Sequence, residues 1–191
     1  GEELWTDDVK RTDAPAETHF TVRRNGIGPG FIDLYQMKLM AGREFIATDY
    51  NDDLNKLHSI ILNEAVLKLV GFKSANDAVG KQIKTGDRNW DVIGVVADFH
   101  QRSLHYPIEP AIFIPTFSMR DHFSVKVDSH DLSSKIAAIK KKYDSFFSGN
   151  LFDYYFLDEK FNEQYGNDKL FGKVFSIFSA FAIFIACLGL L

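Results

Sequence analysis

The segment Trp90-Asp91-Val92-Ile93-Gly94-Val95-Val96-Ala97 decides the fold class, because it is the strongest strand signal in the chain. Its β-branched residues occupy consecutive positions, and consecutive residues of a strand point to opposite faces of a sheet. Both faces of this strand are therefore expected to be buried, which is typical of a strand in the middle of a sheet. We predict a central strand over residues 90–97.

Shorter strands and helices alternate loosely on both sides of this segment. The expected strands are 20–23, 59–62, 111–114, 123–127 and 152–157, and the expected helices are 31–40, 64–70 and 132–147, with a short helical turn between Ser74 and Gly80. Asn63 is a suitable N-cap and Gly71 a suitable C-cap for helix 64–70. The pattern has no internal repeat and no long linker, and it indicates an α+β fold of mixed α/β layers.

The composition is that of an ordinary globular protein, with 191 residues, 46% hydrophobic and 25% charged. The 22 Lys and Arg residues and 26 Asp and Glu residues give a net charge of −4. With no basic run, this balance argues against nucleic-acid binding, which needs clustered cations. The single cysteine, Cys187, excludes an internal disulfide framework and a Cys-rich zinc site.

The end of the chain predicts the start of a membrane span. Residues 174–191 contain no charge and no proline. As a helix they would be about 27 Å long, and a bilayer core is about 30 Å thick. The polar, acidic start of the chain is unlike a signal peptide, so we expect a piece of a longer membrane protein. The alternative is a buried core helix of a soluble protein.

Small residues recur in this tail at intervals of three and four, which places them on one stripe of a helix. They are Ser179, Ala182, Ala186 and Gly189. Such stripes let membrane helices approach closely, so we expect packing against a partner helix. The alternative is that small residues are simply common in membrane helices. Upstream, the run 140–142 of three lysines is typical of a solvated helix face, and contact with anionic lipid is its alternative.

Candidate chemistry is sparse. Asp98, His100 and His105 could together bind zinc or iron, but hydrogen bonds that anchor a loop at the strand end are the favoured interpretation. The sequence has no nucleophile motif and no Walker motif. We therefore predict no catalytic residue, no resident metal and no cofactor, and we expect any ATP hydrolysis to occur in another subunit.

Short motifs follow one another in a fixed order. They are Leu39-Met-Ala-Gly-Arg43-Glu-Phe45, Ile61-Leu-Asn-Glu64, Val79-Gly-Lys-Gln-Ile83, the segment from Trp90 to His100, Ser103-Leu-His105, Pro107-Ile-Glu-Pro110 and Phe156-Leu-Asp-Glu-Lys-Phe161. In this order, and directly before an apolar helix, they resemble the MacB-like periplasmic core domain of FtsX/MacB-type ABC-transporter permeases. The resemblance covers about residues 31–191.

The resemblance implies a division of the chain. It predicts an irregular arm or cut end over 1–30, a sabre-like α/β part over 31–97, a porter-like α/β part over 98–165, and the stalk and the start of a transmembrane helix over 166–191. The motif residues are expected to be structural: Gly42, Arg43, Asn63, Gly80, Gly94, Asp98, His100, Pro110 and Asp158. For Arg43 we expect a guanidinium that holds neighbouring loop carbonyls or a carboxylate.

The function implied by the resemblance is that of an extracytoplasmic domain that couples ATP-driven stalk motion to export or release of a substrate. The implied partners are a cytoplasmic ABC ATPase, a second permease copy, and a periplasmic adaptor or a lipoprotein or peptide substrate. The implied location is the inner membrane, with the globular part in the periplasm. The alternatives are a membrane-tethered sensor or ligand-binding domain and a membrane-anchored hydrolase or metal enzyme.

Overall fold

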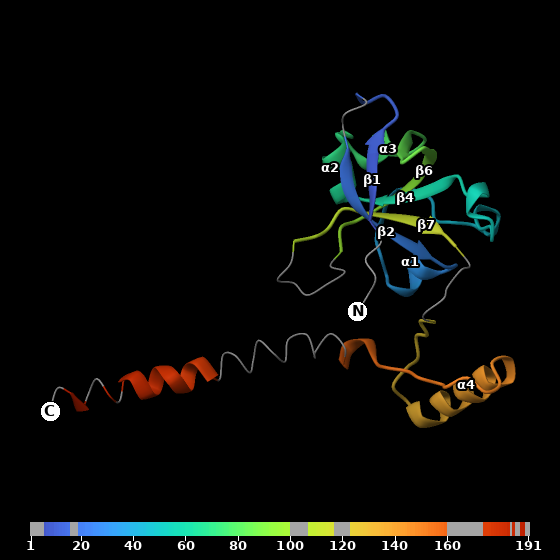
Figure 1. Cartoon of the computed structure of the whole chain (residues 1–191). Helices are drawn as coiled ribbons and strands as arrows, with labels where there is room; N and C mark the ends of the chain where they lie inside the picture. Colours follow the sequence, from blue (N-terminus) through green and yellow to red (C-terminus); the bar gives the residue numbers. More distant parts are fainter. Residues whose placement is uncertain are drawn as a thin grey trace. The chain divides into compact units, whose positions relative to one another are not determined.

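The computed structural model describes residues 6–15, 19–99, 107–116, 123–159, 174–183, 185, 188 and 189. The chain forms two compact units, unit 1 over residues 1–126 and unit 2 over residues 127–191 (Figure 1). Each unit is considered by itself.

Unit 1 combines a seven-stranded sheet with short helices, which confirms the predicted mixed α/β fold. The strands are β1 (Thr6–Arg11), β2 (Phe20–Ile27), β3 (Leu39–Gly42), β4 (Ser59–Asn63), β5 (Gln82–Thr85), β6 (Arg88–Val96) and β7 (Ala111–Pro115). The helices are α1 (Phe31–Leu34), α2 (Glu64–Val70) and α3 (Ala75–Ala78), with 3-10 turns at η1 (Ala47–Asp49) and η2 (Leu54–Lys56). The pairs β2–β7 and β4–β6 are parallel, and the other pairs are antiparallel.

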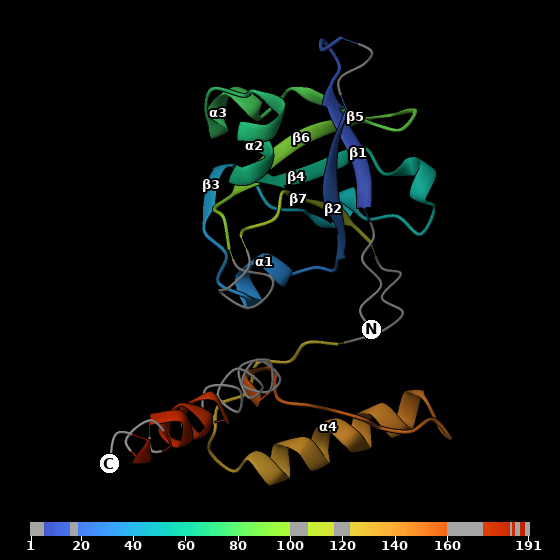
Figure 2. The ribbon, with the colours of Figure 1, turned by 60° about the vertical axis from the view of Figure 1, so that its left-hand side comes forward.

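The sheet closes on itself. Its order is β3-β6-β4-β7-β2-β1-β5, and β5 also pairs with β6. Strand β6 is long enough for two neighbours on one side: residues 88–91 pair with β5, and residues 94–96 pair with β3. Six strands therefore form a closed ring, and β3 is added to the far end of β6, at the outer edge of the unit in Figure 2.

Apolar residues fill both faces of the central strands. In β4, Ile60 and Leu62 belong to the cluster that packs on α2 and α3, whereas Ile61 belongs to a smaller cluster on the other face that includes residues of α1. In β6, Val92 and Val95 lie in the first cluster and Val96 in the second. The prediction of a strand buried on both faces is thus confirmed.

The start of unit 1 differs from the irregular arm or cut end predicted over residues 1–30. Strands β1 and β2 belong to the ring, although Thr6–Arg11 shows no alternation of apolar and polar residues. Only Val9 of β1 is fully buried, and the strand is stabilised by backbone pairing with β2 and β5. Such pairing between distant segments leaves little trace in the sequence.

One other prediction for unit 1 is wrong. Helix 31–40 ends after one turn at Leu34, because Gln36 has a positive φ of 53° and the chain then pairs with β6 as β3. The predicted boundary between residues 97 and 98 separates β6 from β7, and β7 pairs with both β2 and β4 of the same sheet. The division at this boundary, like the names sabre-like and porter-like, stays a prediction.

Unit 2 contains α4 (Leu132–Phe146), which agrees with the predicted helix 132–147 to within one residue. The expected strands 123–127 and 152–157 have no strand partner among the described residues. Residues 174–183 of the tail are helical. No helix within the described ranges combines the length and apolarity of a membrane span. The predicted span 174–191 includes residues outside those ranges and stays a prediction.

Candidate functional site

The motif residues gather in two places in unit 1, and both are backbone junctions. The first is the crossing of β3 and β6. Gly42 has a φ of 77°, and a Cβ at this position would lie 2.1 Å from the carbonyl oxygen of Ile93. A Cβ on Gly94 would lie 2.4 Å from the carbonyl oxygen of Arg43. Only glycine lets the two strands approach this closely.

Arg43 holds the long connection that follows β3. Its Nη1 lies 2.6 Å from Oδ2 of Asp49, and its Nη2 lies 3.1 Å from Oδ1. The Asp49 carboxylate also accepts hydrogen bonds from the backbone N–H of Ile46 and the hydroxyl of Ser59, each at 2.8 Å. Because Ser59 begins β4, this carboxylate ties the connection to the sheet. Arg43 has the kind of partner expected for the motif arginine.

Electrostatics at this junction follow from burial. Burial alone would raise the pKa of Asp49, but the hydrogen bonds from Arg43, Ile46 and Ser59 outweigh it and hold the pKa below its usual value. Burial next to the carboxylates of Asp49 and Glu44 raises the pKa of Tyr50 to about 12. The carboxylate is therefore ionised, and the phenol neutral, at physiological pH.

A second arginine, which sequence reasoning missed, holds the other half of the same connection. The Arg88 guanidinium lies over the Trp90 ring, 4.5 Å from its centroid, and donates to the carbonyl oxygens of Leu57, at 2.8 Å, and Leu54. The signal available in the sequence was the spacing of two between Arg88 and Trp90, which places both on one face of a strand.

The second junction surrounds Asn63, which is fully buried at the end of β4. Its Oδ1 accepts from the backbone N–H of Val66, at 3.2 Å, and of Ala111, at 2.9 Å. Its Nδ2 donates to the carbonyl oxygen of Glu109 at 2.9 Å. Asn63 therefore caps α2, as the sequence predicts, and also fixes the entry into β7.

Charged side chains complete this junction. The Asp98 carboxylate accepts from the backbone N–H of Ala65 at 2.8 Å, and the N–H of Asp98 donates to the Glu64 carboxylate at 3.1 Å. On the β7 side, Arg23 pairs with Glu109 at 2.7 Å, and its N–H donates to the carbonyl oxygen of Pro110 at 2.8 Å. Segments 97–99 and 109–111 are thus both fixed beside the start of α2.

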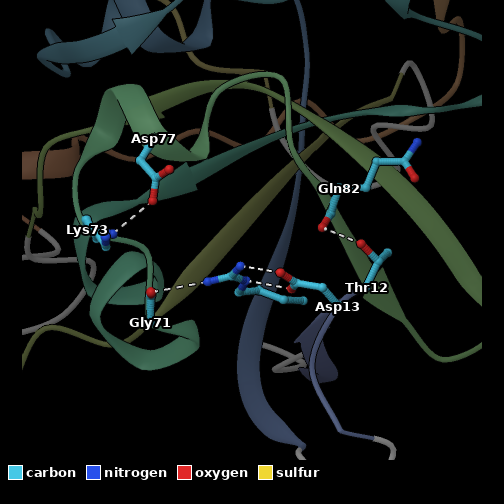
Figure 3. Close-up of polar contacts among 7 residues, drawn as sticks. Thr12, Asp13, Gly71, Lys73, Asp77 and Gln82 are labelled. Atoms are coloured by element: carbon cyan, nitrogen blue, oxygen red, sulfur yellow. Dashed lines mark hydrogen bonds and ion pairs between the residues drawn. The ribbon is translucent and has the colours of Figure 1, made fainter.

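At another end of the ring, the end of β1 and the turn after it contact residues 71–72, between α2 and α3, and strand β5 (Figure 3). Arg11 forms a two-fold hydrogen bond with Asp13, donates to the carbonyl oxygen of Gly71 at 3.4 Å, and lies over the Phe72 ring. Thr12 donates to the carbonyl oxygen of Gln82 at 3.3 Å. These contacts fix the end of β1 against its neighbours.

The remaining predicted residues are dispersed. The N–H of Gly80 donates to the carbonyl oxygen of Val92 at 2.8 Å. Asp158 lies in a helical turn of unit 2, and the described small residues of the tail are Ser179, Ala182 and Gly189. His100, His105 and Ala186 lie outside the described residues. Within the described ranges, no three His, Cys, Asp or Glu residues are placed to hold a metal.

The geometry is that of a scaffold, because the motif residues serve backbone junctions. A family model described as the MacB-like periplasmic core domain matches residues 6–142. The chain belongs to the MacB-like periplasmic core domain family. This is a family of periplasmic permease domains and not of catalytic domains. No curated protein matches the chain.

Three solved structures are similar to this MacB-like domain. The periplasmic region of MacB from Actinobacillus actinomycetemcomitans is 19% identical, with a TM-score of 0.48, over 74% of this chain and 64% of the other. A domain of a putative permease from Porphyromonas gingivalis is 16% identical, with a TM-score of 0.46, over 73% and 61%. The extracellular domain of the ABC-type transporter YknZ from Gram-positive bacteria is 19% identical, with a TM-score of 0.42, over 59% and 50%. The chain spans less than two thirds of each of these structures.

Proposed function

We propose that this chain is the extracytoplasmic coupling domain of an ABC-transporter permease subunit, which transmits ATP-driven motion of a membrane stalk to export or release of a substrate. The observation that carries the proposal is that the family's motif residues hold the backbone junctions of unit 1 together. Strand pairing closes unit 1 into a ring, and the hydrogen bonds of Arg43, Asn63 and Asp98 fix the connections between its strands. A body that keeps its shape under load suits the transmission of force.

Unit 2 would supply the connection to the membrane. Its tail, residues 174–191, carries no charge, and the described part of it is helical. In this proposal residues 158–173 form the stalk, unit 1 corresponds to the sabre-like part, and residues 127–157 contribute to the porter-like part. The proposed partners are a cytoplasmic ABC ATPase, a second permease copy in the inner membrane, and an adaptor or a lipoprotein or peptide substrate.

The proposal is tested on the full-length parent, extracted in mild detergent from its native host. We expect an ATPase to co-purify, and its activity to change when two glycines are inserted within residues 158–173. The control is the same insertion at Gly86-Asp87, in the turn between β5 and β6, where no change is expected. The proposal fails if no ATPase associates, or if the two insertions have the same effect.

A further inference from the structure

Strand β1 is held in the ring mainly by its backbone. Five of its six residues are exposed or half-buried, and only Val9 is fully buried. By contrast, β7 buries all five of its residues, and β4 buries four of five. Because burial of apolar side chains is the main favourable contribution to folding, β1 adds far less to the stability of unit 1 than β4 or β7 does.

The side-chain contacts along β1 are long and lie near the surface. The Asp8 carboxylate accepts from the hydroxyl of Thr21 at 3.2 Å, and the partly exposed Asp7 pairs with Arg24 at 3.2 Å. Ion pairs and hydrogen bonds that water can reach contribute little to stability. These contacts therefore do not compensate for the small apolar area that β1 buries.

The firmest contact of β1 acts only at its last residue, where the Arg11 guanidinium lies over the Phe72 ring. The two hydrogen bonds that leave this end of the strand and its turn for the α2–α3 connection and for β5 are weak, at 3.4 and 3.3 Å (Figure 3). The strand is thus anchored at one end and held loosely along the rest of its length.

The pairing between β1 and β5 also places two lysines opposite each other, because Lys10 is the Cα partner of Lys84. Side chains directly opposite in an antiparallel pair interact, and like charges at such positions are destabilising. Lys84 has a carboxylate 3.9 Å away, that of Asp87, but the Asp87 side chain is fully exposed and this pair is weak. The charges at this pairing therefore favour the separation of β1 from β5.

The rest of unit 1 does not depend on β1 for its continuity. Without β1, the ring strands still follow one another as neighbours in the order β5-β6-β4-β7-β2. The hydrogen bonds of Arg43, Asn63 and Asp98 fix connections among β3, β4, α2 and β7. Departure of β1 would leave these junctions intact.

We propose that β1 is a detachable strand, which separates from β2 and β5 while the other strands of unit 1 stay paired. Unit 1 then passes between a closed ring and an open sheet. Local opening of this kind occurs where buried apolar contacts are few. The inference goes beyond the proposed function and does not depend on it.

The test is native-state hydrogen exchange of the full chain in mild detergent, followed by mass spectrometry at urea concentrations below the unfolding transition. Exchange through local opening responds little to urea, whereas exchange through global unfolding accelerates with it. We expect the amides of residues 7–11 to exchange roughly tenfold or more faster than those of residues 60–63 and 92–96, and to be insensitive to urea. Exchange of all three segments at one rate, with one dependence on urea, overturns the inference.

A charge reversal provides the second test. Lys84→Glu places a carboxylate opposite Lys10, and the exchange of residues 7–11 should become roughly fivefold slower. Lys38→Glu makes the same change of charge at an exposed position before β3 and should leave this exchange unchanged. If the two variants have the same effect on residues 7–11, separation at the β1–β5 pairing is wrong.

Discussion

Replacement of the buried Asn63 by Ala removes three hydrogen bonds at once. The backbone N–H of Val66 loses its cap, and the N–H of Ala111 and the carbonyl oxygen of Glu109 each lose the hydrogen bond to Asn63. Loss of an N-cap costs about 1 kcal/mol. Each buried polar group left unpaired costs about 1–3 kcal/mol. With the lower value for each group, we expect the free energy of unfolding to fall by roughly 3 kcal/mol.

The measurement is urea unfolding in mild detergent, followed by the fluorescence of Trp90, which is 4% exposed. Trp5 is replaced by Phe in every variant so that one tryptophan reports. With a slope of about 2 kcal/mol per molar, the midpoint should fall by roughly 1.5 M urea while the slope stays the same. Asn89→Ala, on an exposed position of β6, is the control and should shift the midpoint little.

Asn63→Asp separates the two roles of the side chain. It keeps the oxygen that accepts from Val66 and Ala111, but it places an acceptor against the Glu109 carbonyl where Nδ2 donated. We expect a loss between those of the control and Asn63→Ala. A midpoint shift for Asn63→Ala no larger than that for Asn89→Ala would refute the assignment of Asn63 as the junction between α2 and β7.

Further predictions concern the β3–β6 crossing and its carboxylate. Gly94→Ala should destabilise unit 1 far more than Gly86→Ala. A Cβ at position 94 would lie 2.4 Å from the carbonyl oxygen of Arg43, whereas a Cβ at position 86 meets no atom and adds only the cost of the positive φ of 55°. Equal midpoints in urea would contradict this. Asp49 has a lowered pKa in the folded state, so its stabilisation is present above pH 4 and is lost as the pH falls further. Asp49→Asn should therefore be less stable than the wild type at pH 7 and should lose less stability between pH 5 and pH 3. If the free energies of unfolding of the two proteins fall in parallel between pH 5 and pH 3, this prediction is wrong. Ultraviolet titration should show one tyrosine ionising near pH 12, absent in Tyr50→Phe.

Local signals predicted much of unit 1 correctly. Asn63 and Gly71 bound α2 as expected, and Ser74 caps α3, because caps act within a single turn. Strands β1 and β3 escaped prediction for the opposite reason. The charged segment Thr6–Arg11 and the four residues Leu39–Gly42 are strands only because distant strands pair with them.

At the two junctions, too, local signals predicted some residues, and contacts between distant segments could not be predicted. The motif itself pointed to Gly42 and Arg43, but nothing in the local sequence identifies Asp49 or Ser59 as partners of Arg43, since the fold brings them together. Asp98 was singled out beside two histidines, yet its carboxylate accepts from the start of α2, thirty-three residues earlier in the chain. Contacts of this range depend on topology, which periodicity does not encode.

The closed ring also has a consequence for synthesis. Strand β1 pairs with β5 more than seventy residues later in the chain, at Val9↔Thr85. During translation β1 therefore leaves the ribosome well before the strand that closes the ring against it, and until then the outer edge of β1 is open to other chains. The slowest and most aggregation-prone step in making this domain should be closure of that seam, where loops of high sequence separation have to be ordered.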